Sequence, residues 1–119
     1  VVVVDETLLE SVDVTRGLKK EGAIVINSAK KASELRGLLR GYEGRVYTID
    51  AGTISRKHLG GYFPNTPMLA AIVAVSECVK KDKFLEDMKV SYQHKFAKKP
   101  QVIEGNLLCL KEAMEEVKE

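Results

Sequence analysis

Three short runs rich in β-branched residues recur in the first half of the chain, at residues 1–4, 23–26 and 46–49. The first run has no polar alternation, a pattern typical of a strand that is covered on both faces of a parallel sheet. Their starts are separated by about 22 residues, which is long enough for a helical crossover. The pattern therefore predicts a βαβαβ unit with a parallel sheet and right-handed connections.

The segments between the predicted strands carry helix signals. A first short helix is indicated by three apolar residues, Leu8, Leu9 and Val12. A second is predicted over residues 14–21, with Asp13 as its N-cap and Gly22 just past its end. A third helix, over residues 33–40, is expected to follow the second strand, with Ser33 as its N-cap.

The second half of the chain has helical patterns throughout. A short helix is predicted over residues 53–59, followed by a proline-containing loop at residues 62–67. Residues 68–79 are apolar nearly all round, so we expect a buried helix there, with Thr66 as its N-cap. Pro100 begins the last helix, whose apolar stripe has helical spacing: Ile103, Leu107, Leu110, Met114 and Val117.

Length and composition agree with one α/β domain. The chain has 119 residues, of which 45% are hydrophobic and 30% charged, so it is long enough for one core and too short for two ordinary domains. We expect three layers, with flanking helices on a mostly parallel sheet. Because residues 1–4 already resemble the middle of a buried strand, we expect residues 1–119 to be the C-terminal portion of a single domain whose N-terminal part is missing.

Charge and hydropathy disfavour several classes of protein. A net charge of +2 does not predict nucleic-acid or membrane binding by bulk charge. The longest apolar run, residues 68–75, is far shorter than the ~20 residues that a membrane span needs. Residues 80–99 contain seven lysines. Such a run is usually a solvated helix face, and the alternative is a surface that attracts an acidic partner or a phosphate.

The cysteines and histidines indicate no catalytic or metal centre. Cys78 and Cys109 lie outside any metal-binding motif, which favours reduced thiols packed on helices of a cytoplasmic protein and leaves a disulfide open. His58 and His94 have no partners at ligand spacing, and the glycines do not form a phosphate-binding loop. We therefore expect neither a catalytic residue nor a metal ligand in this chain.

Polar residues follow each predicted strand: Asp5, Asn27 with Ser28, and Asp50. The carboxyl ends of parallel strands form the usual ligand crevice of open α/β sheets, so these side chains are candidates for binding a ligand or a partner. Asp, Asn and Ser are also the preferred helix N-caps. Both interpretations stay open, and capping is the commoner one for any single residue.

Asn65 and Thr66 lie between Pro64 and Pro67, directly ahead of the predicted buried helix. The prolines stiffen this loop, and a helix start offers free backbone N–H groups. Such a corner suits a ligand anion or a partner's carbonyl group. The alternative is an ordinary cap and turn.

Several ordered segments of the chain resemble one known family. They are residues 4–9, 17–18, 22–27, 46–51, 64–69 and 102–106, with the sequences VDETLL, GL, GAIVIN, VYTIDA, PNTPML and VIEGN. In this order and spacing they are similar to the gamma subunit, or gamma domain, of 2-oxoacid:ferredoxin oxidoreductases, the pyruvate synthase group. The similarity covers essentially the whole chain.

The resemblance implies an enzyme that oxidatively decarboxylates a 2-oxoacid to an acyl-coenzyme A and passes the electrons to ferredoxin. Thiamine diphosphate, Mg and iron–sulfur clusters would then be held by other subunits, of alpha, beta and delta type, in a cytoplasmic heteromeric complex. This chain would be a non-catalytic gamma subunit that binds no cofactor itself and borders the coenzyme A side. Among its residues, the resemblance indicates Asn65 and Thr66 as functional.

Two departures and two alternatives accompany the resemblance. In this family a Gly-rich segment with a strand and a helix normally precedes the matching part, and a glycine is usual where this chain has Ala70 and Ala71. One alternative function is a free-standing nucleotide- or coenzyme A-binding α/β module. The other is a purely structural assembly subunit.

Overall fold

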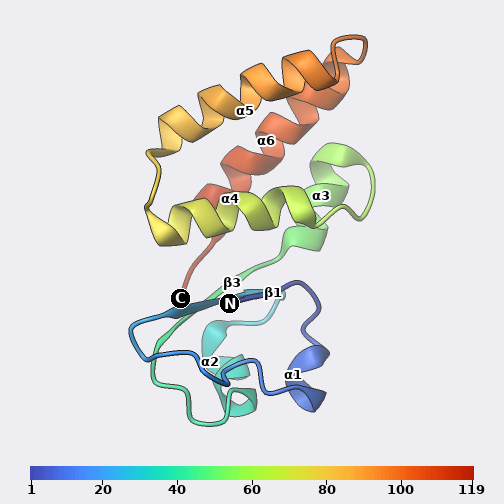
Figure 1. Cartoon of the computed structure of the whole chain (residues 1–119). Coiled ribbons are helices and arrows are strands. Elements are labelled where there is room, and N and C mark those ends of the chain that lie inside the picture. Colours follow the sequence, from blue (N-terminus) through green and yellow to red (C-terminus); the bar gives the residue numbers. More distant parts are fainter.

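The computed structural model describes all 119 residues and contains one parallel sheet with helices on both faces (Figure 1). The strands follow each other across the sheet in chain order: β1 (Val2–Val3), β2 (Ala23–Asn27) and β3 (Arg45–Ile49). Val25 of the central strand β2 is in register with Val2 on one side and Tyr47 on the other. The predicted parallel α/β architecture is confirmed.

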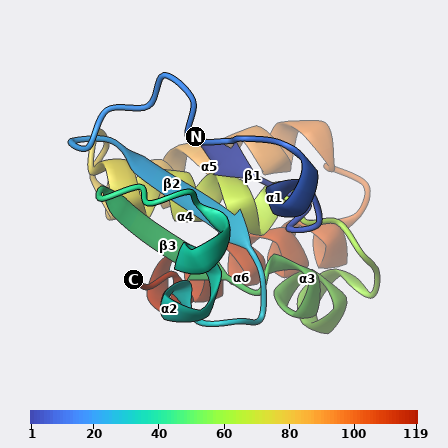
Figure 2. The same cartoon turned by 90° about the horizontal axis from the view of Figure 1, so that it is seen from below.

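The helices form a thin layer on one face of the sheet and a thick layer on the other. The thin layer lies below the sheet in Figure 1 and nearest the viewer in Figure 2; it consists of α1 (Leu8–Ser11), α2 (Ala32–Leu35) and the 3₁₀ turn η1 (Arg36–Leu38). The thick layer consists of α3 (Ala51–Leu59), α4 (Asn65–Ser76), α5 (Lys81–Lys95) and α6 (Pro100–Glu116). Within the thick layer, α4 lies against the sheet and α5 is outermost.

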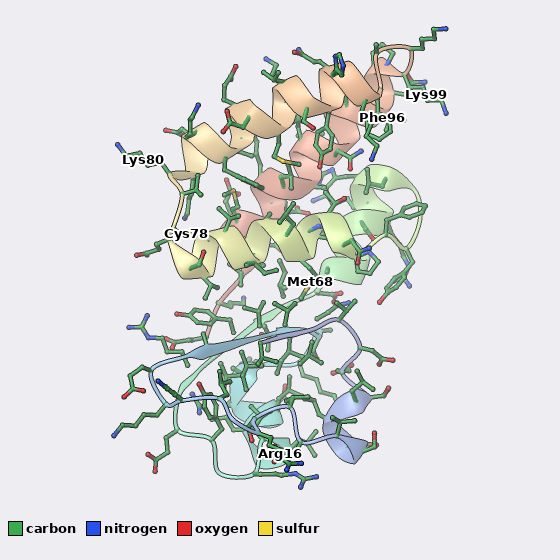
Figure 3. The ribbon with its side chains drawn as sticks, in the orientation of Figure 1. Arg16, Met68, Cys78, Lys80, Phe96 and Lys99 are labelled. Carbon is green, nitrogen blue, oxygen red and sulfur yellow. The ribbon has the colours of Figure 1, made fainter.

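Successive residues of a strand point to opposite faces of the sheet and enter two separate hydrophobic cores. Ile24 and Val46 pack below the sheet with Leu35 of α2. Val25 packs above it, in the larger core that contains Met68 of α4. Met68 lies on the side of α4 that faces the sheet (Figure 3). Both faces of β2 are therefore covered, as its uninterrupted apolar sequence predicts.

α4 confirms the prediction of a buried apolar helix in the second half of the chain. Ala70 and Ala71 are fully buried, and α4 packs more extensively on α6 than on any other element. Small side chains let the two helix backbones approach each other without leaving a void.

The predicted end of this helix at residue 79 is wrong. α4 ends at Ser76, because Glu77 takes left-handed backbone geometry (φ 54°). Cys78 is consequently exposed in the connection to α5 (Figure 3) and does not pack on a helix as expected. Cys109 of α6 is buried, as predicted.

The helix predicted over residues 14–21 is absent, and this segment forms turns. Gly17 has left-handed geometry (φ 79°) in its middle, and a segment this short cannot offset the cost of nucleating a helix around such an interruption. Asp13 closes a local turn, in which its Oδ1 accepts from the Thr15 backbone N–H (3.1 Å) and hydroxyl (2.6 Å). Gly22 therefore ends no helix.

The helix predicted over residues 33–40 is shorter and begins earlier. Lys31 is its N-cap, and the Lys31 backbone N–H donates to Glu34 Oε2 (2.7 Å), so Ser33 is not the capping residue. After one turn the backbone tightens into η1, and Arg40 (φ 52°) stops the helical geometry. Gly37 lies within this stretch, and glycine disfavours a longer helix because it loses more conformational entropy in a helix than other residues do.

The first strand is less buried than its sequence predicts. Only Val3 is buried, whereas Val1, Val2 and Val4 are 51%, 42% and 39% exposed. The expectation that both faces of residues 1–4 are covered is therefore wrong in this structure. β1 is an edge strand, and no neighbour pairs with its outer side.

The end of the chain returns to the opposite edge of the sheet. Lys118 forms an antiparallel bridge with Thr48 of β3, through hydrogen bonds of 2.8 and 3.2 Å between their backbone groups. This short tail covers part of the β3 edge, and the two ends of the chain lie at opposite edges of the sheet (Figure 2). None of the helices combines the length and the apolar character needed to cross a membrane.

Candidate functional site

Asn27 ends β2 and joins three backbone segments at the carboxyl edge of the sheet. Its Nδ2 donates to the Val4 carbonyl oxygen (3.1 Å) and to the Tyr62 hydroxyl (3.2 Å), and its Oδ1 accepts from the Ala51 backbone N–H (3.0 Å). Val4 follows β1, Ala51 begins α3, and Tyr62 belongs to the loop after α3. One amide side chain therefore holds together the edge at which the sequence predicts a ligand or partner.

Asp5 and Asp50 follow the strands on either side of Asn27; Asp5 closes a local turn, and Asp50 caps a helix. Hydrogen bonds from the Thr7 hydroxyl (2.7 Å) and the Thr7 backbone N–H (3.0 Å) to Asp5 Oδ1 lower the pKa of Asp5. Asp50 is the N-cap of α3 and accepts from the Thr53 backbone N–H (3.1 Å) and hydroxyl (2.8 Å). α3 consequently begins two residues earlier than its predicted start at residue 53.

The loop between α3 and α4, residues 60–64, is braced against α3; we call it the contact loop. Gly60 ends α3 in left-handed geometry (φ 72°), which glycine adopts without steric cost. The hydroxyl oxygen of the fully buried Ser55 lies 2.9 Å from the carbonyl oxygens of both Gly52 and Gly61, which share its one proton, and it accepts from the Phe63 backbone N–H (3.1 Å). Ser55 thus fixes the course of the loop backbone.

Two aromatic side chains of the contact loop are exposed to solvent. Tyr62 is 52% and Phe63 57% exposed. The Tyr62 ring lies close against Gly52, where an added Cβ would approach it to 3.0 Å, and the Arg56 guanidinium lies 5.2 Å from its centroid. Exposed aromatic groups on a rigid loop are typical of surfaces that bind a partner or a ligand.

Asn65 and Thr66 begin α4 directly after the contact loop. The prediction of Thr66 as the N-cap is wrong: Pro64 already has helical geometry (φ −69°, ψ −15°) and is itself the N-cap. Thr66 lies inside the first turn, where its hydroxyl is 3.3 Å from Asn106 Oδ1 of α6. Asn65 is exposed, and no side chain caps the helix, so its first backbone N–H groups remain open to a partner.

The predicted site residues fall into two groups, which the contact loop connects. Asp5, Asn27 and Asp50 share the carboxyl edge of the sheet, and Asn65 and Thr66 begin α4. Tyr62 of the contact loop links the groups through its hydrogen bond to Asn27.

Ser55 and Tyr62 are the residues of this site that sequence reasoning missed. Ser55 is one of several polar residues in the helix predicted over residues 53–59, and nothing in the sequence distinguishes it from a surface serine. Tyr62 is the first residue of the proline-containing loop predicted over residues 62–67, and this position was the only available signal.

A separate polar cluster joins α3 to α6. Lys57 Nζ lies 2.6 Å from Glu112 Oε1, and His58 Nε2 lies 3.2 Å from Glu112 Oε2. The hydrogen bond from Lys57 is the main cause of the lowered pKa of Glu112, with a smaller contribution from His58. His58 therefore has a carboxylate partner that no local sequence spacing could show.

The residues of this chain do not fit the metal centres that the resemblance implies for a complete complex. No group of three or more His, Cys, Asp or Glu side chains is placed to hold a metal ion. Iron–sulfur clusters are typically held by four cysteine thiolates, whereas this chain has two cysteines. Burial is the main cause that raises the pKa of the Cys109 thiol to about 11, which suits packing better than metal ligation.

Comparison with known proteins decides the family. The sequence profile of the pyruvate ferredoxin/flavodoxin oxidoreductase family matches residues 1–116. The chain belongs to this family. The match spans both groups of candidate site residues and all three strands.

Curated members of the family from bacteria and archaea are similar to the chain. The pyruvate synthase subunit PorC of Thermotoga maritima is 38% identical over 99% of the chain and 59% of its own length. PorC of Methanocaldococcus jannaschii is 42% identical over 91% of the chain and 59% of its own length. The gamma subunit common to the pyruvate and ketoisovalerate oxidoreductases of Pyrococcus furiosus is 34% identical, over 83% of the chain and 54% of its own length.

A solved structure confirms the fold. The crystal structure of the pyruvate oxidoreductase subunit PORC from Thermotoga maritima superposes with a TM-score of 0.83 at 31% identity, over 98% of this chain and 62% of that one. The chain thus spans rather more than half the length of the family members it matches.

Proposed function

We propose that this chain is the gamma-type part of a pyruvate or 2-oxoacid:ferredoxin oxidoreductase complex, which converts a 2-oxoacid to an acyl-coenzyme A and reduces ferredoxin. The observation that supports it most is the family match over residues 1–116, together with relatives that are named as PorC or gamma subunits. In this proposal the chain is a non-catalytic subunit of a cytoplasmic complex. Alpha-, beta- and delta-type subunits would hold thiamine diphosphate, Mg and the iron–sulfur clusters.

We propose further that the contact loop and the start of α4 form the surface with which the chain borders coenzyme A or a neighbouring subunit. Support comes from the exposed side chains of Tyr62, Phe63 and Asn65 on a backbone that Ser55 holds in place. A surface held in its binding geometry beforehand loses less conformational entropy on binding.

The third part of the proposal is that residues 1–119 are the C-terminal portion of a larger domain. The exposed side chains of Val1, Val2 and Val4 on the outer strand support it, because an apolar edge strand is normally paired or covered. The greater length of the relatives agrees with it. A further strand beside β1 would satisfy the free edge and bury these valines.

Reconstitution tests the proposed function. The full-length protein that contains this chain is combined with its partner subunits, and pyruvate- and coenzyme A-dependent reduction of ferredoxin is measured with and without it. We expect activity to depend on the chain. Equal rates in its absence would overturn the proposal.

Substitution of Asn65 by Ala tests the proposed surface within the same complex. Asn65 is exposed, so the change should leave folding intact. Loss of one hydrogen bond from a binding surface should raise the KM for coenzyme A by about threefold to tenfold. Gln93→Ala, which removes an exposed amide from α5, is the matched control. Unchanged turnover and unchanged KM in Asn65→Ala would favour a purely structural assembly role.

A further inference from the structure

A cavity of about 750 Å³ lies on the other side of the carboxyl edge, away from the contact loop. It is enclosed by β3, by the segment from Ser28 to Arg36 that contains α2, and by the C-terminal tail around Lys118. Figure 2 shows α2 and the end of the chain next to each other beside β3. A volume of this size accommodates a small organic molecule rather than a single ion.

The hydroxyl group of a largely buried threonine faces this cavity. Thr48 of β3 lines the cavity and is only 5% exposed, yet its hydroxyl has no hydrogen-bond partner in the structure, whereas its backbone groups pair with Lys118. Every fully buried side-chain oxygen or nitrogen atom of the chain has a hydrogen-bond partner, so the Thr48 hydroxyl keeps solvent-accessible surface on the cavity. The hydroxyl is therefore available to a molecule bound in the cavity.

The charged side chains around the cavity favour an anion. Four are cationic: Lys30, Lys31, Arg36 and Lys118. No ion pair of the structure involves any of these three lysines. Three acidic residues also line the cavity, Asp50, Glu116 and Glu119, but the Asp50 carboxylate already accepts two hydrogen bonds from Thr53.

Arg36 is fixed in place by the backbone beyond η1. Its guanidinium donates to the Tyr42 carbonyl oxygen (3.2 Å) and the Gly44 carbonyl oxygen (3.1 Å). These two bonds leave further N–H donors of the guanidinium available, because the group carries five. A guanidinium held in this way is a rigid donor at the cavity wall.

We propose that this cavity binds an organic phosphate, with the phosphate group held by Lys30, Lys31 and the Thr48 hydroxyl. Lysine ammonium groups and hydroxyl donors are ordinary phosphate ligands. The rest of the cavity accommodates the organic part of the molecule. This cavity is separate from the surface formed by the contact loop and the start of α4. Ligand binding to the cavity is measured without turnover, so a negative result would leave the proposed function untouched.

Calorimetric titration of the full-length protein tests the proposal, with inorganic phosphate, pyrophosphate and ADP as probes at low ionic strength. We expect ADP to bind more tightly than either inorganic probe, because only ADP occupies the whole cavity. ADP binding no tighter than pyrophosphate would overturn the assignment to an organic phosphate. Absence of binding by all three probes would overturn the site itself.

Variants localise the binding. Lys30→Gln combined with Lys31→Gln should weaken ADP at least about tenfold, since it removes two charge-assisted contacts. Thr48→Val keeps the side-chain shape and should weaken ADP about threefold to tenfold. The matched control is Lys89→Gln combined with Lys95→Gln, which removes the same charge from the exposed face of α5. An equal loss in this control, or wild-type affinity in both cavity variants, would refute the proposal.

Discussion

Asn27 and Ser55 show how single side chains define the candidate site. Asn27 joins the ends of β1, β2 and α3, and Ser55 holds the contact loop. The sequence places Asn27 at a strand end, so its position could be predicted. The contacts of both residues could not, because their partners Val4, Ala51 and Phe63 are brought to them by the fold.

Glu112 allows a prediction about pH dependence. Its lowered pKa means that the unfolded chain binds a proton more readily, so its contribution to stability is present above its ordinary pKa of 4.5 and is lost as the pH falls through the lower folded value. Glu112→Gln should therefore reduce the free energy of unfolding by about 0.5–1 kcal/mol at neutral pH. Below the folded pKa, the difference from wild type should vanish.

Urea denaturation at about pH 7 and about pH 3 measures this difference. Glu115→Gln is the matched control, because Glu115 is exposed on the same helix. A Glu112→Gln effect that persists undiminished at the acidic pH would show that the carboxylate charge is not its cause.

At the scale of elements, helix boundaries departed from prediction at single residues. Gly17 prevents a helix in the first crossover and Glu77 ends α4 early, both with left-handed geometry, whereas Pro64 starts α4 early with ordinary helical angles. Propensity and apolar spacing favour a helix along a segment, but its ends depend on caps and on individual backbone angles. The prolines were visible in the sequence; the left-handed geometry of a glutamate was not.

Gly105 provides a prediction about the packing of α6 on α3. A Cβ at this position would lie 2.5 Å from the His58 carbonyl oxygen, a backbone atom that cannot swing away. Gly105→Ala should cost about 1–3 kcal/mol through overpacking, offset by about 1 kcal/mol of improved helix propensity. We therefore expect a lower thermal midpoint for this variant.

Gly37→Ala is the control for this substitution. An added Cβ at Gly37 meets no atom within 4 Å, and its φ is not positive. Its thermal midpoint should equal or exceed that of the wild type. A Gly105→Ala protein as stable as Gly37→Ala would mean that α3 and α6 separate at little cost.

At the scale of the whole molecule, the sheet separates two hydrophobic cores. Ile24 belongs to the core on the α2 side, and Ile54 belongs to the core formed by α3, α4 and α6. The two side chains belong to different clusters. Such an arrangement should transmit little packing strain from one face to the other.

Double substitution tests this separation. Ile24→Val and Ile54→Val should each lower the free energy of unfolding by about 0.5–1.5 kcal/mol, and the double variant should equal their sum within about 0.5 kcal/mol. Ile24→Val with Val46→Ala is the comparison pair, because these two residues are cross-strand neighbours in one core. Coupling between Ile24 and Ile54 as large as that in the comparison pair would contradict the separation.

The sequence by itself determined the fold class, the parallel order of strand and helix, the buried character of α4 and the family resemblance. These features depend on periodicity and local order along the chain, which need no knowledge of distant contacts. The tertiary structure alone decided that Asn27 meets Tyr62, that His58 meets Glu112, and that the C-terminal tail borders a cavity beside β3. These pairings join residues far apart in sequence, and only the packing of the layers sets which of them meet.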